Sequence, residues 1–190
     1  VMAGWNKLYF QEGVFKPDSN KSEQWNRGAY LVEGLGHCGA CHTDTNVLGA
    51  AKTGEKLQGG DFGEHWYAPG LTSNLRDGLG AWSTAEIVEY LKTGANAKSA
   101  AGGPMAEVVK NSTQYLSDVD LSAIAAYLKD VPAGRAQATS KTTDVDKQAW
   151  SRGQALYTDN CTGCHPENGE AIAQNFPSAD ARPGLTAHHP

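Results

Sequence analysis

The sequence predicts an all-α protein made of two tandem helical modules with long loops, the second apparently incomplete. Apolar residues at helical spacing recur in four segments, at about 23–34, 84–93, 118–130 and 145–158. A five-residue motif occurs twice, at Cys38–His42 and Cys161–His165, each time directly after a helical segment. Residues 43–80 are rich in Gly, Thr and Asn and are predicted as loop. Only 25 residues (190 − 165) follow the second motif, so the second module looks cut short.

Both motifs have the form C-x-x-C-H, the attachment sequence of a c-type haem. Its spacing lets two thiols reach the two vinyl groups on one porphyrin edge, and the adjacent imidazole becomes the proximal ligand of the iron. The two copies use all four cysteines of the chain. The sequence therefore predicts two covalently attached haem c groups, held by Cys38, Cys41, His42, Cys161, Cys164 and His165.

Paired cysteines have other uses. They build zinc sites, thioredoxin-like redox pairs and disulfides. A zinc ribbon does not need a histidine directly after both second cysteines, and no βαβ pattern surrounds either copy. These observations favour the haem interpretation.

Composition limits the partners and the location. The formal net charge of −5 argues against a nucleic-acid partner. No run of eighteen apolar residues is present, so we expect no transmembrane segment. The first residues lack a charged and then apolar signal sequence. Because haem is attached to cysteines outside the cytoplasm, we expect an exported protein of the periplasm whose signal peptide is absent from this chain.

The expected domains follow from helix and linker signals. Residues 1–21 have no sustained period and are predicted to be an extended arm lying on the first module. That module covers 22–131 and contains the capping box Ser83–Glu86. Small and polar residues at 132–144 indicate a linker, and 145–190 is the partial second module.

The segment from Trp25 to His42 resembles the cytochrome c subunit of bacterial membrane-bound dehydrogenases, which oxidise alcohols, gluconate and related sugars. The likeness continues through Trp66–Pro69, Leu71–Ser73, Trp82–Ser83 and Met105–Val109, and it covers most of residues 5–177. Such subunits typically carry three haems. This chain looks like the second module and the start of the third.

The resemblance implies that Met105 is the sixth ligand of the first haem. Chemistry supports this role, because a thioether is a soft ligand that favours ferrous iron. Met105 lies between two predicted helices, 63 residues after His42 (105 − 42), and the chain has only one other methionine, Met2. The predicted metal ligands are therefore His42, Met105 and His165.

Other roles are also implied by the resemblance. Tyr67 and Trp82 lie near the haem propionates, and Gly28 is the point where the first helix meets the closing helix, against Tyr127. Pro177, twelve residues after His165, presents its carbonyl to the ring N–H of that histidine. No proline stands at the matching distance from His42, so the acceptor for that ring is left unassigned.

The sixth ligand of the second haem stays open at this point. The alternatives are a further methionine beyond Pro190, His188 or His189 folded back to the iron, and Met2 reaching the iron from the arm. These alternatives differ in the iron potential that they imply.

The predicted function is periplasmic electron transfer between a dehydrogenase and the respiratory chain, with redox proteins as partners and without catalysis by this chain. A filled His/Met coordination leaves no place for substrate on the iron. The alternative is a dihaem redox enzyme of the peroxidase or thiosulfate dehydrogenase type, with an open or unusually ligated second haem.

Overall fold

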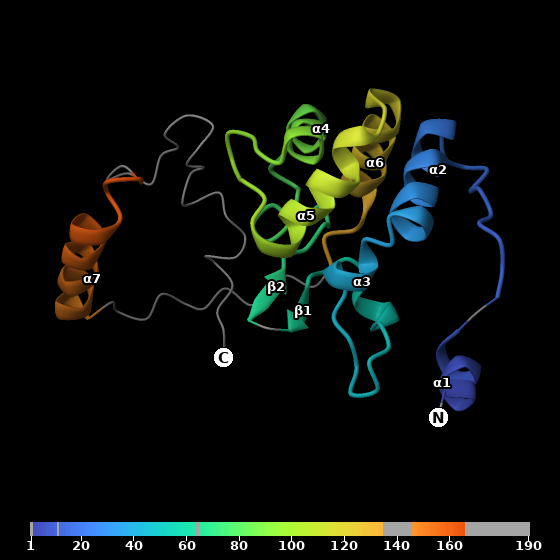
Figure 1. The fold of residues 1–190 in the computed structure, drawn as a ribbon, viewed down its shortest axis with the longest axis horizontal. Coiled ribbons are helices and arrows are strands. Elements are labelled where there is room, and N and C mark those ends of the chain that lie inside the picture. Colours follow the sequence, from blue (N-terminus) through green and yellow to red (C-terminus); the bar gives the residue numbers. More distant parts are fainter. Residues whose placement is uncertain (1, 11, 64, 135–145, 166–190) are drawn as a thin grey trace.

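The computed structural model describes residues 2–10, 12–63, 65–134 and 146–165, and this part of the chain is mostly helical (Figure 1). The α-helices are α1 (Met2–Tyr9), α2 (Glu23–Tyr30), α3 (Gly39–His42), α4 (Thr84–Thr93), α5 (Gly103–Asn111), α6 (Asp118–Asp130) and α7 (Lys147–Asn160). The shorter elements are a π-helical turn η1 (Leu31–Leu35), two 3₁₀ turns η2 (Thr53–Glu55) and η3 (Thr113–Tyr115), and strands β1 (Gly60–Gly63) and β2 (Trp66–Ala68).

Helices α2 and α6 form the main contact of the fold, side by side in Figure 1. They run in opposite directions, because Lys21 at the start of α2 pairs with Asp130 at the end of α6, and Arg27 pairs with Asp120. A Cβ added at Gly28 would lie 1.9 Å from the carbonyl oxygen of Ala123. The predicted helix contact at Gly28 is therefore confirmed: the missing side chain lets the two backbones meet.

The interior has two adjoining clusters, both built on α6. One joins α2 and η1 to α6 and to Leu57, and its buried members are Ala29, Leu31, Val32, Leu57, Ile124, Tyr127 and Leu128. The other joins α4 to α6 through Trp82, Ile87 and Ala125. Helix α6 therefore lies between α2 and α4 and contributes buried side chains to both clusters.

The two ion pairs across the α2–α6 contact hold carboxylates in their charged form. Arg27 donates to Asp120 over 2.7 Å, and Lys21 donates to Asp130 over 2.6 Å. The hydrogen bond from Arg27 holds the pKa of Asp120 below its usual range, and the hydrogen bond from Lys21 does the same for Asp130. A lowered pKa in the folded state means that deprotonation of these groups favours folding.

We expect this contribution to be present above the unfolded pKa of about 3.9 and to be lost as the pH falls through the lower folded values. Thermal unfolding followed between pH 6 and pH 3 measures it. A variant combining Asp120→Asn and Asp130→Asn should melt below the parent at pH 6, and the gap should close toward pH 3. A difference in melting temperature that stays constant across this range would mean that ionisation of these two carboxylates does not contribute to stability.

Helix ends agree well with the sequence. The bounds 84–93 and 118–130 are confirmed by α4 and α6. The Ser83 hydroxyl accepts from the backbone N–H of Glu86 and the Glu86 carboxylate accepts from the N–H of Ser83, which completes the predicted capping box. Gly94 ends α4 in the left-handed conformation, with φ of 82°.

Other elements differ from the sequence prediction. The arm at 1–21 is not wholly extended, because its first half forms α1. It does lie on the following domain, since the Trp5 indole N–H donates to the Leu48 carbonyl over 3.0 Å and Phe15 packs edge-on to Tyr30. The helix predicted at 23–34 changes to a π-helical turn after Tyr30. The loop at 43–80 contains the β1–β2 hairpin, and 103–111 forms a helix that the pattern did not predict.

Helix α7 begins two residues later than predicted and has no buried residue. The predicted linker at 132–144 falls mostly outside the described residues. Within the described ranges, no helix combines the length and apolar character needed to cross a membrane.

Candidate haem-attachment site

The first motif folds into one helical turn, which places its three functional side chains together. Cys38 precedes α3, and its carbonyl accepts from the N–H of Cys41 over 3.3 Å and of His42 over 3.0 Å. Residues three and four positions apart share a face of a helix. Both thiols and the imidazole therefore leave the same side of this turn, as double attachment to one porphyrin edge requires.

His42 is held by a carbonyl from a distant part of the chain. Its Nδ1–H donates to the carbonyl oxygen of Pro69 over 2.7 Å. A carbonyl only accepts, so the proton resides on Nδ1 and the Nε2 lone pair is left for a metal. Burial lowers the pKa of His42, which keeps the imidazole neutral at neutral pH.

The Pro69 acceptor was missed by the sequence analysis. It lies 27 residues after His42 rather than twelve. The available signal was its place at the end of Trp66–Pro69, one of the stretches that carry the family resemblance. Pro177, the acceptor implied for His165, lies outside the described residues.

Residues just before β1 hold the segment that leaves His42. The His42 carbonyl accepts from Gly59 over 3.0 Å, and the Thr43 hydroxyl accepts from Leu57 over 3.0 Å. Gly59 has a φ of +97°, and a Cβ there would lie 2.6 Å from the Tyr67 hydroxyl. The haem motif and the hairpin are thus joined by the backbone on one side and through Pro69 on the other.

The alternative uses of the cysteines fit less well. No disulfide joins the four cysteines, and the described residues contain no group of three or more His, Cys, Asp or Glu able to hold a metal ion. Burial raises the pKa of Cys38 to about 11 and also raises that of Cys41. A reactive redox cysteine needs the opposite shift. The donor set of two thiols and one neutral imidazole on a single turn fits a covalently bound haem.

The remaining predicted residues of the first site come from α5, β2 and the loop before α4. Met105 is partly buried in the first turn of α5, directly after Pro104. Tyr67 lies on β2, and burial raises its pKa, with a smaller effect from the nearby Asp44 carboxylate. Trp82 is only 7% exposed and packs edge-on to Tyr90, with ring centres 5.5 Å apart, so it is part of the core.

Lys129 is a supporting residue that the sequence did not suggest. Its ammonium donates to the carbonyls of Leu79 over 3.2 Å, Gly80 over 2.8 Å and Trp82 over 2.7 Å. These bonds tie the loop before α4 to the end of α6. The only sequence signal was a lysine in the last turn of a helix, a common position for this residue type.

The second motif repeats the hydrogen bonding of the first. The Cys161 carbonyl accepts from the N–H of Cys164 over 3.0 Å and of His165 over 2.8 Å. The Tyr157 hydroxyl from α7 donates to the His165 carbonyl over 3.3 Å. Of the other candidates for the second iron, Met2 lies on α1 and is 67% exposed, whereas His188 and His189 lie outside the described residues.

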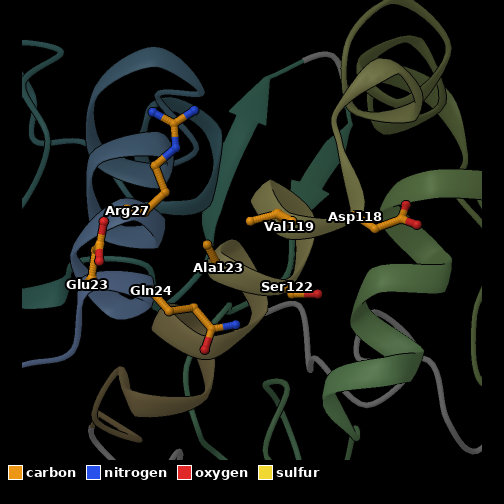
Figure 2. Close-up of a pocket in the computed structure, with 7 residues that line it drawn as sticks. All are labelled: Glu23, Gln24, Arg27, Asp118, Val119, Ser122 and Ala123. Atoms are coloured by element: carbon orange, nitrogen blue, oxygen red, sulfur yellow. The ribbon is translucent and has the colours of Figure 1, made fainter.

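A groove lies where α2 meets α6, and its lining residues differ in chemistry from the candidate haem residues (Figure 2). Its lining residues are Glu23, Gln24, Arg27, Asp118, Val119, Ser122 and Ala123. None of them is a thiol, imidazole or thioether, so the groove is separate from the candidate haem residues.

Comparison with known proteins agrees with the chemistry of the two motifs. The chain is 40% identical over 179 residues to the fructose dehydrogenase cytochrome subunit of Gluconobacter japonicus, covering 84% of this chain and 37% of that protein. It is 39% identical over 198 residues to the gluconate 2-dehydrogenase cytochrome c subunit of Pantoea cypripedii, covering 96% and 45%. It is 42% identical over 139 residues to a diheme cytochrome c-type protein of Cereibacter sphaeroides, covering 70% and 44%.

The chain thus spans less than half the length of these relatives. The family model for cytochrome c matches residues 26–132 and 150–190, which include both C-x-x-C-H turns. Together with the shared face of the thiols and the imidazole, these matches show that the chain belongs to the cytochrome c family.

Proposed function

We propose that this chain carries two covalently attached haem c groups and transfers electrons between redox proteins, without catalysing a reaction of its own. The observation that carries the proposal is the pair of C-x-x-C-H turns with the same backbone hydrogen bonds, in the first of which Pro69 orients His42. A bound haem supplies one-electron chemistry; the side chains attach it, orient it and exclude water.

In this proposal each residue of the first site has a separate task. Cys38 and Cys41 hold the porphyrin, and His42 ligates through Nε2 because Nδ1 is bonded to Pro69. Met105 is proposed as the second protein ligand, and with it the iron would have no position left for a substrate. Tyr67 and Trp82 are proposed neighbours of the propionates, with Trp82 also serving as core.

The second site is proposed by analogy with the first. Cys161 and Cys164 attach the haem and His165 is the proximal ligand, with the carbonyl of Pro177 as the acceptor for its ring. We assign the first haem module to 22–131 and a partial second module to 145–190, with an arm at 1–21 and a linker at 132–144. The diheme relative supports the count of two.

The proposed partners follow from the relatives, which are named as subunits of fructose and gluconate dehydrogenases. We propose a dehydrogenase as the electron donor and a quinone-linked complex or oxidase of the respiratory chain as the acceptor, in the periplasm. The net charge of −5 favours a partner with a basic docking surface.

Intact-mass measurement of the native protein tests the haem count, and two haems per chain are expected. Replacing Cys161 and Cys164 by Ser should remove one haem mass and leave the other.

Assays for peroxide and thiosulfate turnover should give no activity, whereas reduction and reoxidation by small redox proteins should be fast. Rapid and complete carbon monoxide binding at both ferrous haems, or turnover in either assay, would contradict a pure electron-transfer role.

A further inference from the structure

We propose that the β1–β2 hairpin positions both axial ligands of the first haem, and that the indole of Trp66 sets the place of Met105 by packing on Gly103. The inference rests on the proposed function, in which His42 and Met105 ligate the same iron. It assigns Trp66 and Gly103 as positioning residues, which act through the ligands rather than on the iron.

The proximal half of this arrangement is a hydrogen bond. Pro69 directly follows β2 (Trp66–Ala68), and its carbonyl accepts from His42 over 2.7 Å. On the neighbouring side, Gly59, just before β1, donates to the His42 carbonyl over 3.0 Å. The hairpin is therefore fixed to the haem motif at both of its outer ends.

The distal half is a contact with the backbone before Met105. A Cβ added at Gly103 would lie 2.3, 2.5 and 2.6 Å from three atoms of the six-membered ring of Trp66. Such distances mean that the ring lies directly against the Gly103 backbone, where only glycine leaves room. Trp66 stands at the opposite end of β2 from Ala68, so this short strand reaches the segments of both ligands.

The backbone between the Trp66 contact and Met105 is short and conformationally restricted. Gly103 has a φ of +49°, in the left-handed region that side chains disfavour. Pro104 follows with its fixed φ, and Met105 is the next residue, in the first turn of α5. Because the backbone angles between them are restricted, a displacement of Gly103 should displace Met105 by a similar distance.

The other side of the segment is held independently by the end of α4. Ala101 donates to the Gly94 carbonyl over 2.7 Å, and the side chain of buried Asn96 accepts from Lys98 and Ser99 over 2.8 and 2.9 Å. Removing the Trp66 ring thus leaves one anchor in place. Trp66 is also 46% exposed, so its loss should shift Met105 without unfolding the module.

The first test is Trp66→Leu in the holoprotein. We expect the near-infrared magnetic circular dichroism of His/Met iron to weaken at one haem and its potential to move toward that of Met105→Ala. Carbon monoxide binding at the first ferrous haem should rise several-fold. Thermal melting checks that the variant is folded, and Tyr115→Leu, a change at an aromatic residue 76% exposed, should match the parent in all three haem measurements.

Adjacent glycines give a matched pair of variants. Gly103→Ala places a methyl group against the Trp66 ring, whereas a Cβ at Gly102 has no atom within 4 Å. Gly103→Ala should reproduce the spectral change and Gly102→Ala should not. In the Trp66→Leu background the additional effect of Gly103→Ala should be smaller than in the parent, because contacting residues are not additive.

Two negative outcomes separate this inference from the proposed function. If Met105→Ala loses the His/Met spectrum while Trp66→Leu and Gly103→Ala keep it, the ligand assignment stands and the hairpin does not position Met105. If Met105→Ala itself keeps the parent spectrum, Met105 is not the ligand, and the inference is overturned together with that part of the proposed function.

Discussion

Replacing Met105 with Ala is expected to lower the reduction potential of one haem and to leave the other nearly unchanged. A thioether stabilises ferrous iron, and its loss opens that iron to water or a stronger donor. Axial ligands set haem potentials over ~0.8 V, and a fall on the order of 100 mV at one haem is expected for a single ligand. Spectroelectrochemical titration of the parent and the variant resolves the two transitions.

Val108→Ala serves as the control, because its side chain lies on the same helix and is 44% exposed. It should leave both potentials within experimental error of the parent. Two unchanged potentials in Met105→Ala would show that this methionine is an ordinary core residue.

Replacing Gly28 with Val is expected to destabilise the first module by about 1–3 kcal/mol, the usual cost of overpacking, and toward the upper end. The first atom of the new side chain would meet the Ala123 carbonyl at 1.9 Å and the Tyr127 Cβ at 2.9 Å. Because one obstacle is backbone, the helices must separate to make room. Denaturant unfolding of the parent and the variant measures the change in free energy.

Gly153 offers the matched control, since it is the corresponding glycine before the second motif. No described atom lies within 4 Å of a Cβ placed there. Gly153→Val should change stability by no more than about 0.5 kcal/mol, as for most exposed sites. Because valine forms helices slightly better than glycine, helix propensity gives no loss at either site. A Gly28→Val variant as stable as Gly153→Val would therefore contradict the close α2–α6 contact.

The features that the sequence predicted well are local or depend on strong spacing rules. The capping box at Ser83 and Glu86 and the bounds of α4 and α6 need only residues a few positions apart. The two C-x-x-C-H turns are equally local. Gly28 was found by its place in the family resemblance, and the structure supplies the physical reason in the Ala123 carbonyl.

The features that were missed depend on contacts between distant segments. The strands β1 and β2 are only four and three residues long, and two of the four residues of β1 are glycine, so they lack an alternating pattern. Pro69 approaches His42 across 27 residues, and Lys129 reaches the loop near Leu79 across 50. Helix α5 begins with Gly103 and Pro104 and is preceded by Gly102, a sequence typical of a loop. The packing of Val109 near Gly94, which supports the helix, is visible only in the structure.

The pairing of Lys21 with Asp130 has a mechanical consequence. The chain enters the first module and leaves it at adjoining points, since these two side chains are 2.6 Å apart. A unit with neighbouring entry and exit points can be placed in series within a longer polypeptide without rearranging its interior. Tension from the flanking chain would pull first at this end of the α2–α6 contact and separate the two helices pair by pair. The segments that carry Cys38, Pro69 and Met105 lie between these points in the sequence and would bear the tension only after the helices part.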